Sequence, residues 1–600
     1  MHDALLKKTL NCDLCVIGGG LSGSFAALAA ARHGAKVVLM QDRPMLGGNA
    51  SSEIRMWVRG AKGVFNRETG LIKELEERNI HSNPTLVHSL FDATLYGMLR
   101  ENENITLLLN TSCLDAKAEN GHIQQVTGWQ LTTYTYFTVE AKIFMDCSGD
   151  SILAPLVGAA YKHGRESSAE YGEVLARPQS DGKTMGMSII LAARELDHPV
   201  KFVRPDFANI YPDDNCFAGD VGESVHAAVR DHKIETSGAN LWWVELGGEV
   251  HSIYDSEQVR DELLACIYGV WDHIKNQGDH GMENWELEWV GFLPGKRESR
   301  RYVGLYTMTE QDIVSGGHFE DEIAYGGWPL DDHNPYGMRR GGEQQFSSIV
   351  TPVKEPYGIP LRCLCARDVD NLMFAGRNIS VSHVALSSTR VMATCAVIGQ
   401  AAGTAAALAL EKGISPKEVV LQHYKTVQKQ LMDDGAFLPH IPREPSALTK
   451  QAKLNLPDED RQRLLNGIER PRTEDDENGI WQEIGESLRF CFDTPKRIGS
   501  LRLQFDPDFP HLSISDNWKM RLFAMKLHTG KDFKPVRIAA TIVKDFVVYA
   551  DGKEVARIGN NYRSLIKVPL HIQAKELSVK WFATNGAEKV HLFSADLLET

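Results

Sequence analysis

The chain of 600 residues is 43% hydrophobic and 24% charged, which is typical of globular proteins, and it exceeds what one hydrophobic core usually supports. Its 65 basic and 79 acidic residues give a net charge of −14, which argues against nucleic-acid and anionic-membrane partners. No run of 18 apolar residues predicts a membrane span, and the first strand begins too close to Met1 to leave room for a signal peptide. We therefore expect a cytoplasmic protein, with a processed periplasmic form as the alternative.

The ten cysteines are scattered along the chain, and no four of them have the spacing of a zinc site. Most lie in apolar stretches, and the pair formed by Cys12 and Cys15 straddles the start of the first strand. Small buried thiols are common in such positions, so we expect structural cysteines and a reducing compartment. No metal site is predicted.

Residues 13–41 predict a nucleotide-binding βαβ unit. A short apolar strand leads into GGGLSG at 18–23, an Ala-rich helix follows, and a second apolar strand closes the unit. Gly18 would allow the tight turn, Gly20 would let backbone N–H groups approach a pyrophosphate, and Gly23 would let helix and strand pack closely. The whole pattern predicts a bound dinucleotide.

The second strand ends where related chains carry an acid that accepts hydrogen bonds from the adenosine ribose, but here the residue is Gln41. A glutamine carbonyl can also accept, and a neutral hydrogen bond contributes about 0.5–1.5 kcal/mol against about 1.5–3 for a charged one, so the loss is small. Asp42 is the alternative if it turns inward. The glycine-rich segment that follows should pass close to the cofactor. The predicted contacts from this part of the chain are Ser22, Gln41, Asp42, Arg43, Gly47, Gly48, Asn49, Ser51 and Ser52.

Three later segments favour FAD over a nicotinamide cofactor. IFMDCSGDS at 143–151 is a strand that ends in small residues and two acids, NLMFAGRNIS at 371–380 is a strand that breaks at a glycine, and 389–410 is a helix rich in small residues. This order resembles the glutathione-reductase-like flavoprotein fold, in which these segments approach FAD. The resemblance implies further cofactor contacts from Asp146, Gly149, Asp150, Gly376, Arg377, Arg390 and Val391.

Four separated motifs, at 43–61, 291–304, 326–335 and 357–364, resemble the bacterial family called FAD-dependent oxidoreductases, which is sometimes mislabelled xanthan lyase. The resemblance covers roughly residues 10–415. It implies an α/β protein with a Rossmann-like FAD-binding domain, and a redox enzyme that uses FAD. It says little about the substrate.

His383 is the preferred catalytic residue, because the resemblance places it near the isoalloxazine ring. Removing the proton of an alcohol while hydride leaves for flavin N5 needs a base whose pKa is near the working pH, and imidazole suits that role. A purely structural histidine is the alternative. In RESRRYVG at 297–304 the charged residues either form a solvated face or bind a polar or anionic substrate, and Arg300 is the candidate retained. Arg55 lies in an alternating segment that predicts either a half-exposed strand or a site residue.

The loop GGWPLDDHNP at 326–335 brings Trp328, Asp331, Asp332 and His333 together. A tryptophan among carboxylates is the usual composition of a sugar contact, and His333 is a further catalytic candidate. A turn with a packed tryptophan is the alternative.

The predicted domains are a discontinuous FAD-binding domain at 1–160 and 360–415, an α+β substrate or cap domain at 161–359, a helical connector at 416–478, and an all-β sandwich at 479–600. In the last domain Asp551-Gly552 between apolar runs predicts a hairpin. The sandwich resembles the galactose-binding-like jelly roll in outline, and it either binds carbohydrate or stabilises an interface.

The function that the sequence favours is oxidation of a secondary alcohol on a carbohydrate or glycoside by an FAD enzyme. One alternative is an ene-reductase of fumarate-reductase type that acts on an unsaturated acid, with the arginines of 297–301 clamping a carboxylate. Another is a carbohydrate-binding protein in which FAD is structural. The expected partner is a small molecule, and a homo-oligomer is left open.

Overall fold

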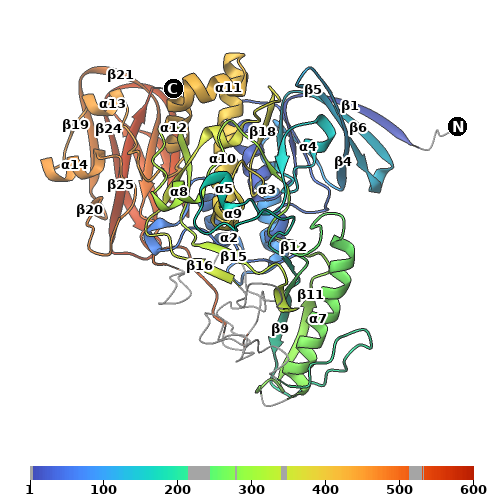
Figure 1. Cartoon of the computed structure of the whole chain (residues 1–600). Coiled ribbons are helices and arrows are strands. Elements are labelled where there is room, and N and C mark those ends of the chain that lie inside the picture. The colour runs from blue at the N-terminus through green and yellow to red at the C-terminus, as the bar shows by residue number, and fades with distance from the viewer. Residues whose placement is uncertain are drawn as a thin grey trace. The chain divides into compact units, whose positions relative to one another are not determined.

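The computed structural model describes residues 5–213, 244–277, 280–339, 348–511, 530 and 533–599. The chain divides into two compact units, whose elements are labelled in Figure 1. The first consists of Met1–Lys62 and Thr85–Gln428 with a short piece ending at Lys534, and the second of Gly63–Pro84, Lys429–Arg521 and Pro535–Thr600. These boundaries differ from the predicted domains at two places. Gly63–Pro84 joins the second unit, and so does the connector from Lys429 onward.

The main sheet of the first unit has seven strands in the order β3-β2-β1-β6-β5-β4, with β18 also paired to β6. The pairs β1–β2, β2–β3, β1–β6 and β6–β18 are parallel, whereas β4–β5 and β5–β6 are antiparallel. The strands are β1 (Leu6–Ile17), β2 (Val37–Met40), β3 (Ile105–Leu108), β4 (Thr111–Glu119), β5 (His122–Gln130), β6 (Thr135–Asp146) and β18 (Leu372–Phe374). This mixed, Rossmann-like sheet confirms the predicted α/β fold class.

Four of the parallel strands end in register. Ile17, the last residue of β1, pairs with Met40 and with Asp146, and Asp146 also pairs with Phe374. The residues that follow these strands therefore meet at one edge of the sheet. Crevices at the carboxyl ends of parallel strands are where open α/β sheets bind their ligands, so this edge positions the site.

Two helices that are distant in sequence, α1 (Leu21–Arg32) and α10 (Met392–Lys412), pack very closely against each other. A Cβ added at Gly399 or at Gly403 would lie 2.1 Å from a carbonyl oxygen of α1, that of Ser22 or of Ala26 respectively. By length and composition α10 could also cross a membrane, but 94% of its apolar window is buried inside the protein, as in a core helix. The small residues predicted at 389–410 thus serve helix packing.

The other strands of the first unit are short and form small sheets outside the main sheet. Small antiparallel sheets join β8, β10 and β12; β9 and β11; β7 and β13; β14 and β17; and β15 and β16. These strands are β7 (Tyr161–Lys162), β8 (Met187–Ser188), β9 (Leu191–Glu195), β10 (Glu245–Leu246), β11 (Trp285–Val290), β12 (Gly295–Lys296), β13 (Arg301–Tyr302), β14 (Glu322–Gly326), β15 (Leu330–His333), β16 (Ser348–Thr351) and β17 (Tyr357–Pro360). The helices are α3 (His88–Arg100), α4 (Leu153–Val157), α5 (Ser168–Tyr171), α7 (Ser256–Asn276), α8 (Glu310–Val314), α9 (His383–Thr389) and α11 (Pro416–Glu418), and α12 (Tyr424–Asp433) continues from this unit into the next.

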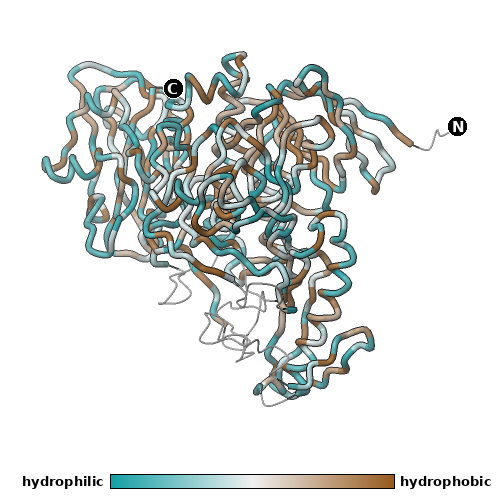
Figure 2. The backbone as a smooth tube through the Cα atoms, in the orientation of Figure 1, coloured by the Kyte–Doolittle hydropathy of each residue, from teal (hydrophilic) through white to brown (hydrophobic). Residues whose placement is uncertain are grey.

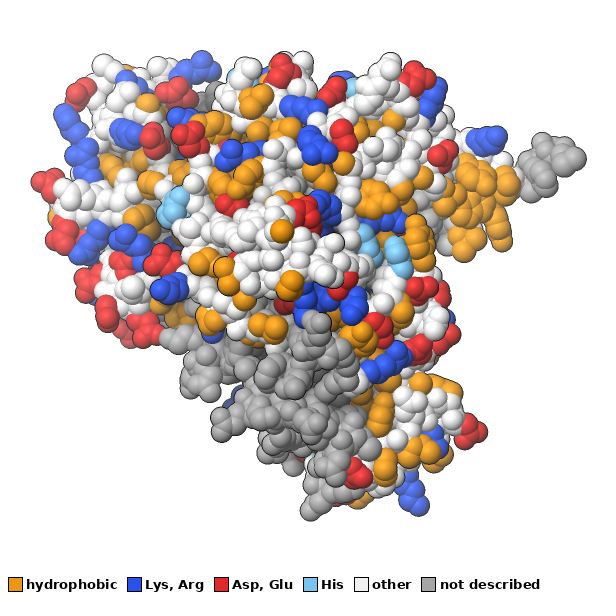
Figure 3. Space-filling view, viewed as in Figure 1, with side chains coloured by type: hydrophobic (Ala, Val, Ile, Leu, Met, Phe, Trp, Pro, Cys, Tyr) orange, Lys and Arg blue, Asp and Glu red, His pale blue; other side chains and the backbone are white. Residues whose placement is uncertain are grey.

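Residues Ser256–Asn276 form the long helix α7. Its apolar face, which includes Leu263, Ile267 and Trp271, packs with Leu191 and Ala193 of β9 in a small separate core. Brown and teal segments accordingly alternate along α7 in Figure 2. On the face shown in Figure 3, acidic and basic side chains are interspersed over most of the surface.

The second unit is built on a seven-stranded, all-antiparallel sheet in the order β20-β25-β21-β24-β22-β23, with β19 on β21. The strands are β19 (Lys453–Leu454), β20 (Ile480–Glu483), β21 (Ser487–Phe505), β22 (Val543–Ala550), β23 (Lys553–Ile558), β24 (Leu565–Thr584) and β25 (Lys589–Leu598), and the helices are α2 (Leu71–Ser82), α13 (Ala447–Gln451) and α14 (Asp458–Leu465). The predicted Asp551-Gly552 hairpin joins β22 to β23, and both turn residues have positive φ, 47° and 80°.

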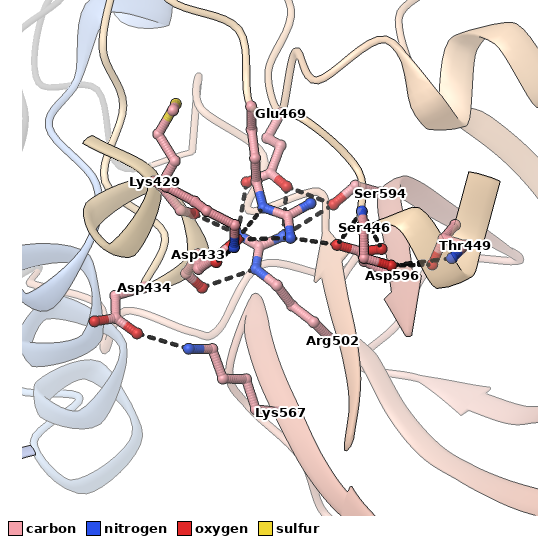
Figure 4. A network of polar contacts seen from close by, with 12 residues as sticks. Lys429, Asp433, Asp434, Ser446, Thr449, Glu469, Arg502, Lys567, Ser594 and Asp596 are labelled. Atoms are coloured by element: carbon pink, nitrogen blue, oxygen red, sulfur yellow. Dashed lines mark hydrogen bonds and ion pairs between the residues drawn. The ribbon is translucent and has the colours of Figure 1, made fainter. Parts of the chain in front are cut away.

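Buried ion pairs attach the connector to this sheet (Figure 4). Arg502 of β21 is fully buried and donates to both carboxylate oxygens of Glu469, to Ser594 Oγ at 3.1 Å, and to the carbonyl of Asp433 at 2.9 Å. Arg443 pairs with Asp433 and with Asp596 of β25. The connector from Lys429 onward is therefore folded as part of the second unit.

The structure describes nine of the ten cysteines. The nine cysteines within the described ranges are free, and Cys15 is buried at the end of β1 whereas Cys12 is half-buried. No group of three or more His, Cys, Asp or Glu side chains among these residues is arranged to hold a metal ion.

Candidate functional site

The glycine-rich turn lies at the carboxyl edge of the main sheet. Gly18 has a φ of +97°, and a Cβ there would lie 2.5 Å from the carbonyl oxygen of Cys147. At Gly23 a Cβ would lie 1.8 Å from the carbonyl oxygen of Gly18, so no larger residue fits. At Gly20, the N-cap of α1, a Cβ would meet only Gly48 Cα at 4.0 Å. Backbone is thus exposed to open space at a helix N-terminus, which is the geometry that a pyrophosphate needs.

Gln41 faces this turn rather than open space. Its Oε1 accepts a hydrogen bond from the Gly19 N–H at 2.6 Å, its Nε2 donates to the carbonyl of Met45 at 3.3 Å, and the residue is only 4% exposed. The structure therefore uses Gln41 to fix the turn. Asp42 does not turn inward as the alternative required, because its side chain is 59% exposed, within 4.0 Å of Arg43.

The segment after Arg43 lies against the glycine-rich turn. The N–H of Gly47 donates to the carbonyl of Gly19 at 2.8 Å, and Gly47 also forms a β-bridge with Gly20. Asn49 Nδ2 donates to the carbonyl of Lys296 at 3.1 Å. The two serines are used locally: Ser51 is buried, and the Ser52 N–H donates to Asp92.

The two acids of the 146–150 turn have different environments. Asp146 is fully buried, and it accepts hydrogen bonds from Ser148, from the N–H of Leu153 and from the Tyr302 hydroxyl; burial raises its pKa. The structure does not support the prediction that Asp146 contacts the cofactor, because its carboxylate oxygens already accept these hydrogen bonds and stabilise the turn.

Asp150 instead carries a negative charge within a cluster of cations. Its carboxylate lies 2.8 Å from Lys296 Nζ and 2.7 Å from Arg377 Nη2 and Ser299 Oγ. Burial opposes ionisation of Asp150, but Lys296 and Arg377 outweigh it and hold the pKa of the carboxyl well below its usual range. A Cβ at Gly149 would lie 2.7 Å from the Arg377 guanidinium carbon, so this glycine lets Arg377 reach Asp150.

The segment from Arg377 to Thr394 contains several buried polar atoms that lack a hydrogen-bond partner among the described residues. Within the part of the chain that the structure describes, the buried atoms Arg377 Nε, Asn378 Oδ1, Thr389 Oγ1, Arg390 Nε and Thr394 Oγ1 have no hydrogen-bond partner. Buried polar atoms without partners are uncommon and call for a ligand or water. Val391 is the N-cap of α10, so a second helix N-terminus lies in this segment. These residues fit the flavin half of an FAD molecule.

His383 is enclosed by carboxylates. At the start of α9, its Nδ1 lies 3.0 Å from Glu298 Oε1 and its Nε2 lies 3.1 Å from Asp332 Oδ1. Burial lowers the pKa of His383, but these two carboxylates outweigh burial and raise it to about 10. The geometry contradicts the predicted general base, because both nitrogens carry protons and both protons are donated.

His333 repeats this arrangement on the neighbouring strand β15. Its Nδ1 lies 2.7 Å from Glu245 Oε2 and its Nε2 lies 3.3 Å from Asp331 Oδ2. Burial would lower its pKa, but Glu245 and Asp331 raise it. Asp331 also pairs with Arg390 at 3.5 Å and accepts from Trp328 Nε1 at 3.4 Å. His333 is thus also unsuited as a base. The polar side chains of the loop expected to contact a sugar instead bind to other residues of the protein.

The arginines of the 297–301 segment differ in their partners. Arg297 lies 3.3 Å from Glu245, and Arg301 pairs with Glu298 and with Glu166, the latter at 2.8 Å. Arg300 is 5% exposed and has no carboxylate within ion-pair distance among the residues the structure describes. The segment is buried throughout, so the solvated-face alternative is wrong.

Arg55 lies outside these clusters. It has a φ of 60° in a turn rather than in the predicted strand, and its guanidinium carbon lies 4.1 Å from the ring centre of Trp289. Its Nε donates to the carbonyl of Ser52. These contacts give Arg55 a packing role and none that points to the chemistry.

A pair of stacked histidines lies next to Arg300, and sequence reasoning missed it. The rings of His163, just after β7, and His251, just before α7, are 4.5 Å apart and within 6° of parallel. Burial, followed by the charge of the neighbouring ring, lowers the pKa of His163; burial and Arg300 lower that of His251. Since the two residues are 88 positions apart and lie in no motif, only the tertiary structure shows them together.

Comparison with known proteins decides what this arrangement belongs to. Residues 13–431 match the protein family described as FAD dependent oxidoreductase, which is more than two thirds of the chain. The protein belongs to this family. It is therefore an FAD-dependent oxidoreductase, and FAD is its cofactor.

Individual relatives of this oxidoreductase are remote. Glycerol-3-phosphate dehydrogenase of Mycobacterium leprae is 41% identical over 69 residues, so the match spans 11% of this chain and 12% of that protein. A geranylgeranyl bacteriochlorophyll reductase-like protein of Thermoplasma acidophilum covers 71% of this chain and 86% of its own at 13% identity and a TM-score of 0.31. A family 32 carbohydrate-binding module of Streptococcus pneumoniae covers 25% of this chain and 93% of its own at 15% identity and a TM-score of 0.17. At these scores the structural similarities carry no functional information.

The residues that would hold FAD in this oxidoreductase form two groups. The open backbone at Gly20, with Gly47 and Gly48 beside it, fits the pyrophosphate. The unpartnered polar atoms of Arg377, Arg390 and their neighbours, which follow Gly376, fit the ring end. Bound FAD supplies a two-electron acceptor, and the chain's own residues supply binding, orientation and proton transfer.

Proposed function

We propose that this enzyme oxidises a secondary alcohol, and that His163 accepts the hydroxyl proton. The observation that carries the proposal is the Nε2 of His163, a buried nitrogen that has no hydrogen-bond partner among the described residues. An alcohol gives up hydride readily when a base takes its proton, and a neutral imidazole with a free nitrogen is such a base.

The surroundings of the pair favour its neutral form. Two stacked imidazoles cannot both be charged without repulsion, and the cations Arg300 and Arg301 add to that repulsion at His163, whereas Glu298 opposes it. At His251 the cations are Arg300 and Lys296, and Asp255 opposes them. Protonation of His163 would stop the reaction. We therefore expect activity to fall only at a pH below the ordinary histidine pKa of 6.5.

Anaerobic reduction of the bound FAD tests the proposal. Secondary alcohols, including sugars, glycosides and hydroxy acids, are mixed with the holoenzyme without oxygen, and loss of the visible FAD absorbance is followed. We expect one class to bleach the enzyme, and His163→Gln to slow bleaching by about 10²–10⁴-fold with unchanged FAD content. His198→Gln, an exposed histidine, is the matched control and should behave as wild type. A panel with no bleaching, or unchanged bleaching in the His163 variant, would refute the proposal.

The carbohydrate or glycoside predicted from sequence stays a prediction. The residues that suggested it, Asp331 and Asp332, are occupied by His333, Arg390 and His383. Sugars nevertheless belong in the panel, because their secondary hydroxyls meet the same chemical requirement.

The second candidate is reduction of an unsaturated acid. The observation that favours it is the buried Arg300, which has no ion pair with a carboxylate in the described part of the chain. The same residues would then deliver a proton instead of accepting one. Chemically reduced holoenzyme, mixed without oxygen with unsaturated acids such as fumarate, separates the candidates. Rapid reoxidation by such acids, combined with no bleaching by any alcohol, would replace the first proposal by this one.

A further inference from the structure

Arg300 differs from its neighbours because, among the residues that the structure describes, no carboxylate lies within ion-pair distance of its guanidinium. Arg297 and Arg301 each face at least one buried carboxylate, whereas the Arg300 guanidinium contacts the Ser151 carbonyl at 3.5 Å and the Tyr254 hydroxyl at 3.4 Å. A buried charge without a counter-charge is strongly unfavourable. An arginine kept in this state is what an anion-binding site requires, because the ligand supplies the missing charge.

The Arg300 guanidinium lies close to the surface, beneath two tyrosines. Its carbon is 5.5 Å from the ring centre of Tyr161 and 6.0 Å from that of Tyr254. These rings are 43% and 74% exposed, so both reach solvent while Arg300 itself is buried. The side of these tyrosines is therefore the one from which we expect a small anion to reach Arg300.

His251 adds a second donor whose direction can be worked out. Its Nδ1 lies 3.2 Å from the backbone nitrogen of Ile253 and 3.3 Å from that of Tyr254, and both N–H groups donate to it. A nitrogen that accepts carries no proton, so in the neutral ring the proton is on Nε2. This Nε2–H has no acceptor among the described residues. The His251 ring also stacks on Tyr254 at 4.2 Å, which places it beside the Arg300 cluster.

We infer that Arg300, the Nε2–H of His251 and the Tyr254 hydroxyl bind an anionic group of the substrate, either a carboxylate or a phosphate ester. The substrate is then an alcohol that carries an anion, with the anion on Arg300 and the hydroxyl near His163, whose ring lies 4.5 Å from His251. That the anion belongs to an alcohol rests on the proposed function; the anion site itself does not.

Among the described residues near Arg300, the other cations are already paired with carboxylates and are not available to bind an anion. Lys296 is neutralised by Asp150 at 2.8 Å, and Arg301 by Glu166 and Glu298. The acids facing the pair, Glu298 and Asp255, are engaged as well: Glu298 by Arg301 and His383, and Asp255 by the His251 N–H at 2.9 Å. The carboxylates present are thus directed at other donors and would not compete for the Arg300 guanidinium.

Binding without turnover tests the inference on the holoenzyme. Malonate and inorganic phosphate are titrated separately by calorimetry, with malonamide as the neutral analogue of malonate. We expect one anion to bind and malonamide not to bind. Arg300→Gln should weaken that anion about ten- to hundredfold, since a hydrogen bond to a charged group contributes about 1.5–3 kcal/mol. Arg300→Lys should restore part of the affinity, and Arg194→Gln, an exposed arginine paired with Glu286, should leave it unchanged.

The identity of the binding anion separates the two sources, since malonate indicates a hydroxy acid and phosphate a phosphorylated alcohol. The inference is overturned if neither anion binds, or if Arg300→Gln binds the anion as tightly as wild type while keeping its FAD. Failure of the proposed function has a different signature: anions still bind through Arg300, but no alcohol bleaches the FAD.

Discussion

At the scale of single residues, carboxylate neighbours decide what each histidine of the site can do. His383 and His333 each lie between two acids that raise their pKa, whereas burial and neighbouring positive charges lower the pKa of His163 and His251. The proton-acceptor role that we propose for His163 depends on this difference. The charged pairs also position α9 and β15, because His383 and Asp332 connect them at 3.1 Å.

The ion pairs of His383 predict a pH dependence of stability. Its folded pKa of about 10 lies above the unfolded value of 6.5, so its contribution is fully present below pH 6.5 and is lost as pH rises toward 10. We expect the free energy of unfolding of the holoenzyme, measured in urea, to fall between these values. His383→Gln should lose about 3–5 kcal/mol at pH 7, because it leaves buried carboxylates uncompensated, and should lack this part of the pH dependence. His198→Gln is the control, and parallel pH profiles for wild type and His383→Gln would contradict the assignment.

At the scale of elements, the close approach of α1 and α10 positions the first turn of α1, which follows the glycine-rich turn proposed to bind the pyrophosphate. Gly399 and Gly403 let α10 contact the backbone of α1, whose first turn begins at Gly20. The two helices are distant in sequence, and each comes from a different part of the predicted FAD-binding domain. Cofactor binding by the turn therefore depends on a helix that follows it by more than 350 residues.

Gly399→Ala tests this dependence. The new Cβ would lie 2.1 Å from the Ser22 carbonyl oxygen, so the helices must separate, and we expect a loss of about 1–3 kcal/mol in stability together with weaker FAD retention. Gly97→Ala in α3 is the matched control, because no atom lies within 4 Å of its Cβ and a helical alanine is favoured by about 0.5–1 kcal/mol. Thermal unfolding and FAD dissociation on dilution measure both effects. Equal behaviour of the two variants would rule out the packing role.

At the scale of the whole molecule, the second unit is not a simple C-terminal appendage. It includes Gly63–Pro84, and the buried Glu77 of α2 accepts a hydrogen bond from the Ser564 N–H at 3.0 Å. Arg563 pairs with Glu74 of the same helix at 2.8 Å. The chain thus passes from the first unit to the second and back before it completes the main sheet.

Removal of the C-terminal sheet should therefore damage the rest of the protein. In a chain ending at Gln428, α2 loses Arg563, which pairs with Glu74, and Ser564, which donates to Glu77, and both glutamates are buried in the intact protein. We expect this truncated protein to bind less FAD, to expose hydrophobic surface to a fluorescent dye, and to be cleaved by protease within Gly63–Pro84. The full chain treated in parallel is the control. A truncated protein with full FAD content and a protected α2 would show that this segment is independent of the sheet.

The sequence by itself determined the cofactor-binding frame, because that frame depends on local backbone geometry. Gly18 has a positive φ, and a Cβ at Gly23 would lie 1.8 Å from the Gly18 carbonyl oxygen, so the turn itself requires glycine at both positions, whereas the pyrophosphate role of Gly20 stays a prediction. The Asp551-Gly552 turn likewise has a pattern that is complete within one stretch of chain. The family resemblance was confirmed over residues 13–431 for the same reason, since its motifs are short and contiguous.

Only the tertiary structure decided the charge state and partners of the polar residues. Whether Arg300 is solvated, paired or left for a ligand depends on carboxylates and rings brought from distant segments, and neither His163 nor His251 has a local signal. The sequence likewise predicts a weakened ribose contact at Gln41, whereas in the structure its Oε1 accepts a hydrogen bond from the Gly19 N–H. Electrostatic interactions act through space and depend on burial, so a linear pattern fixes which groups are present and the fold fixes what they do.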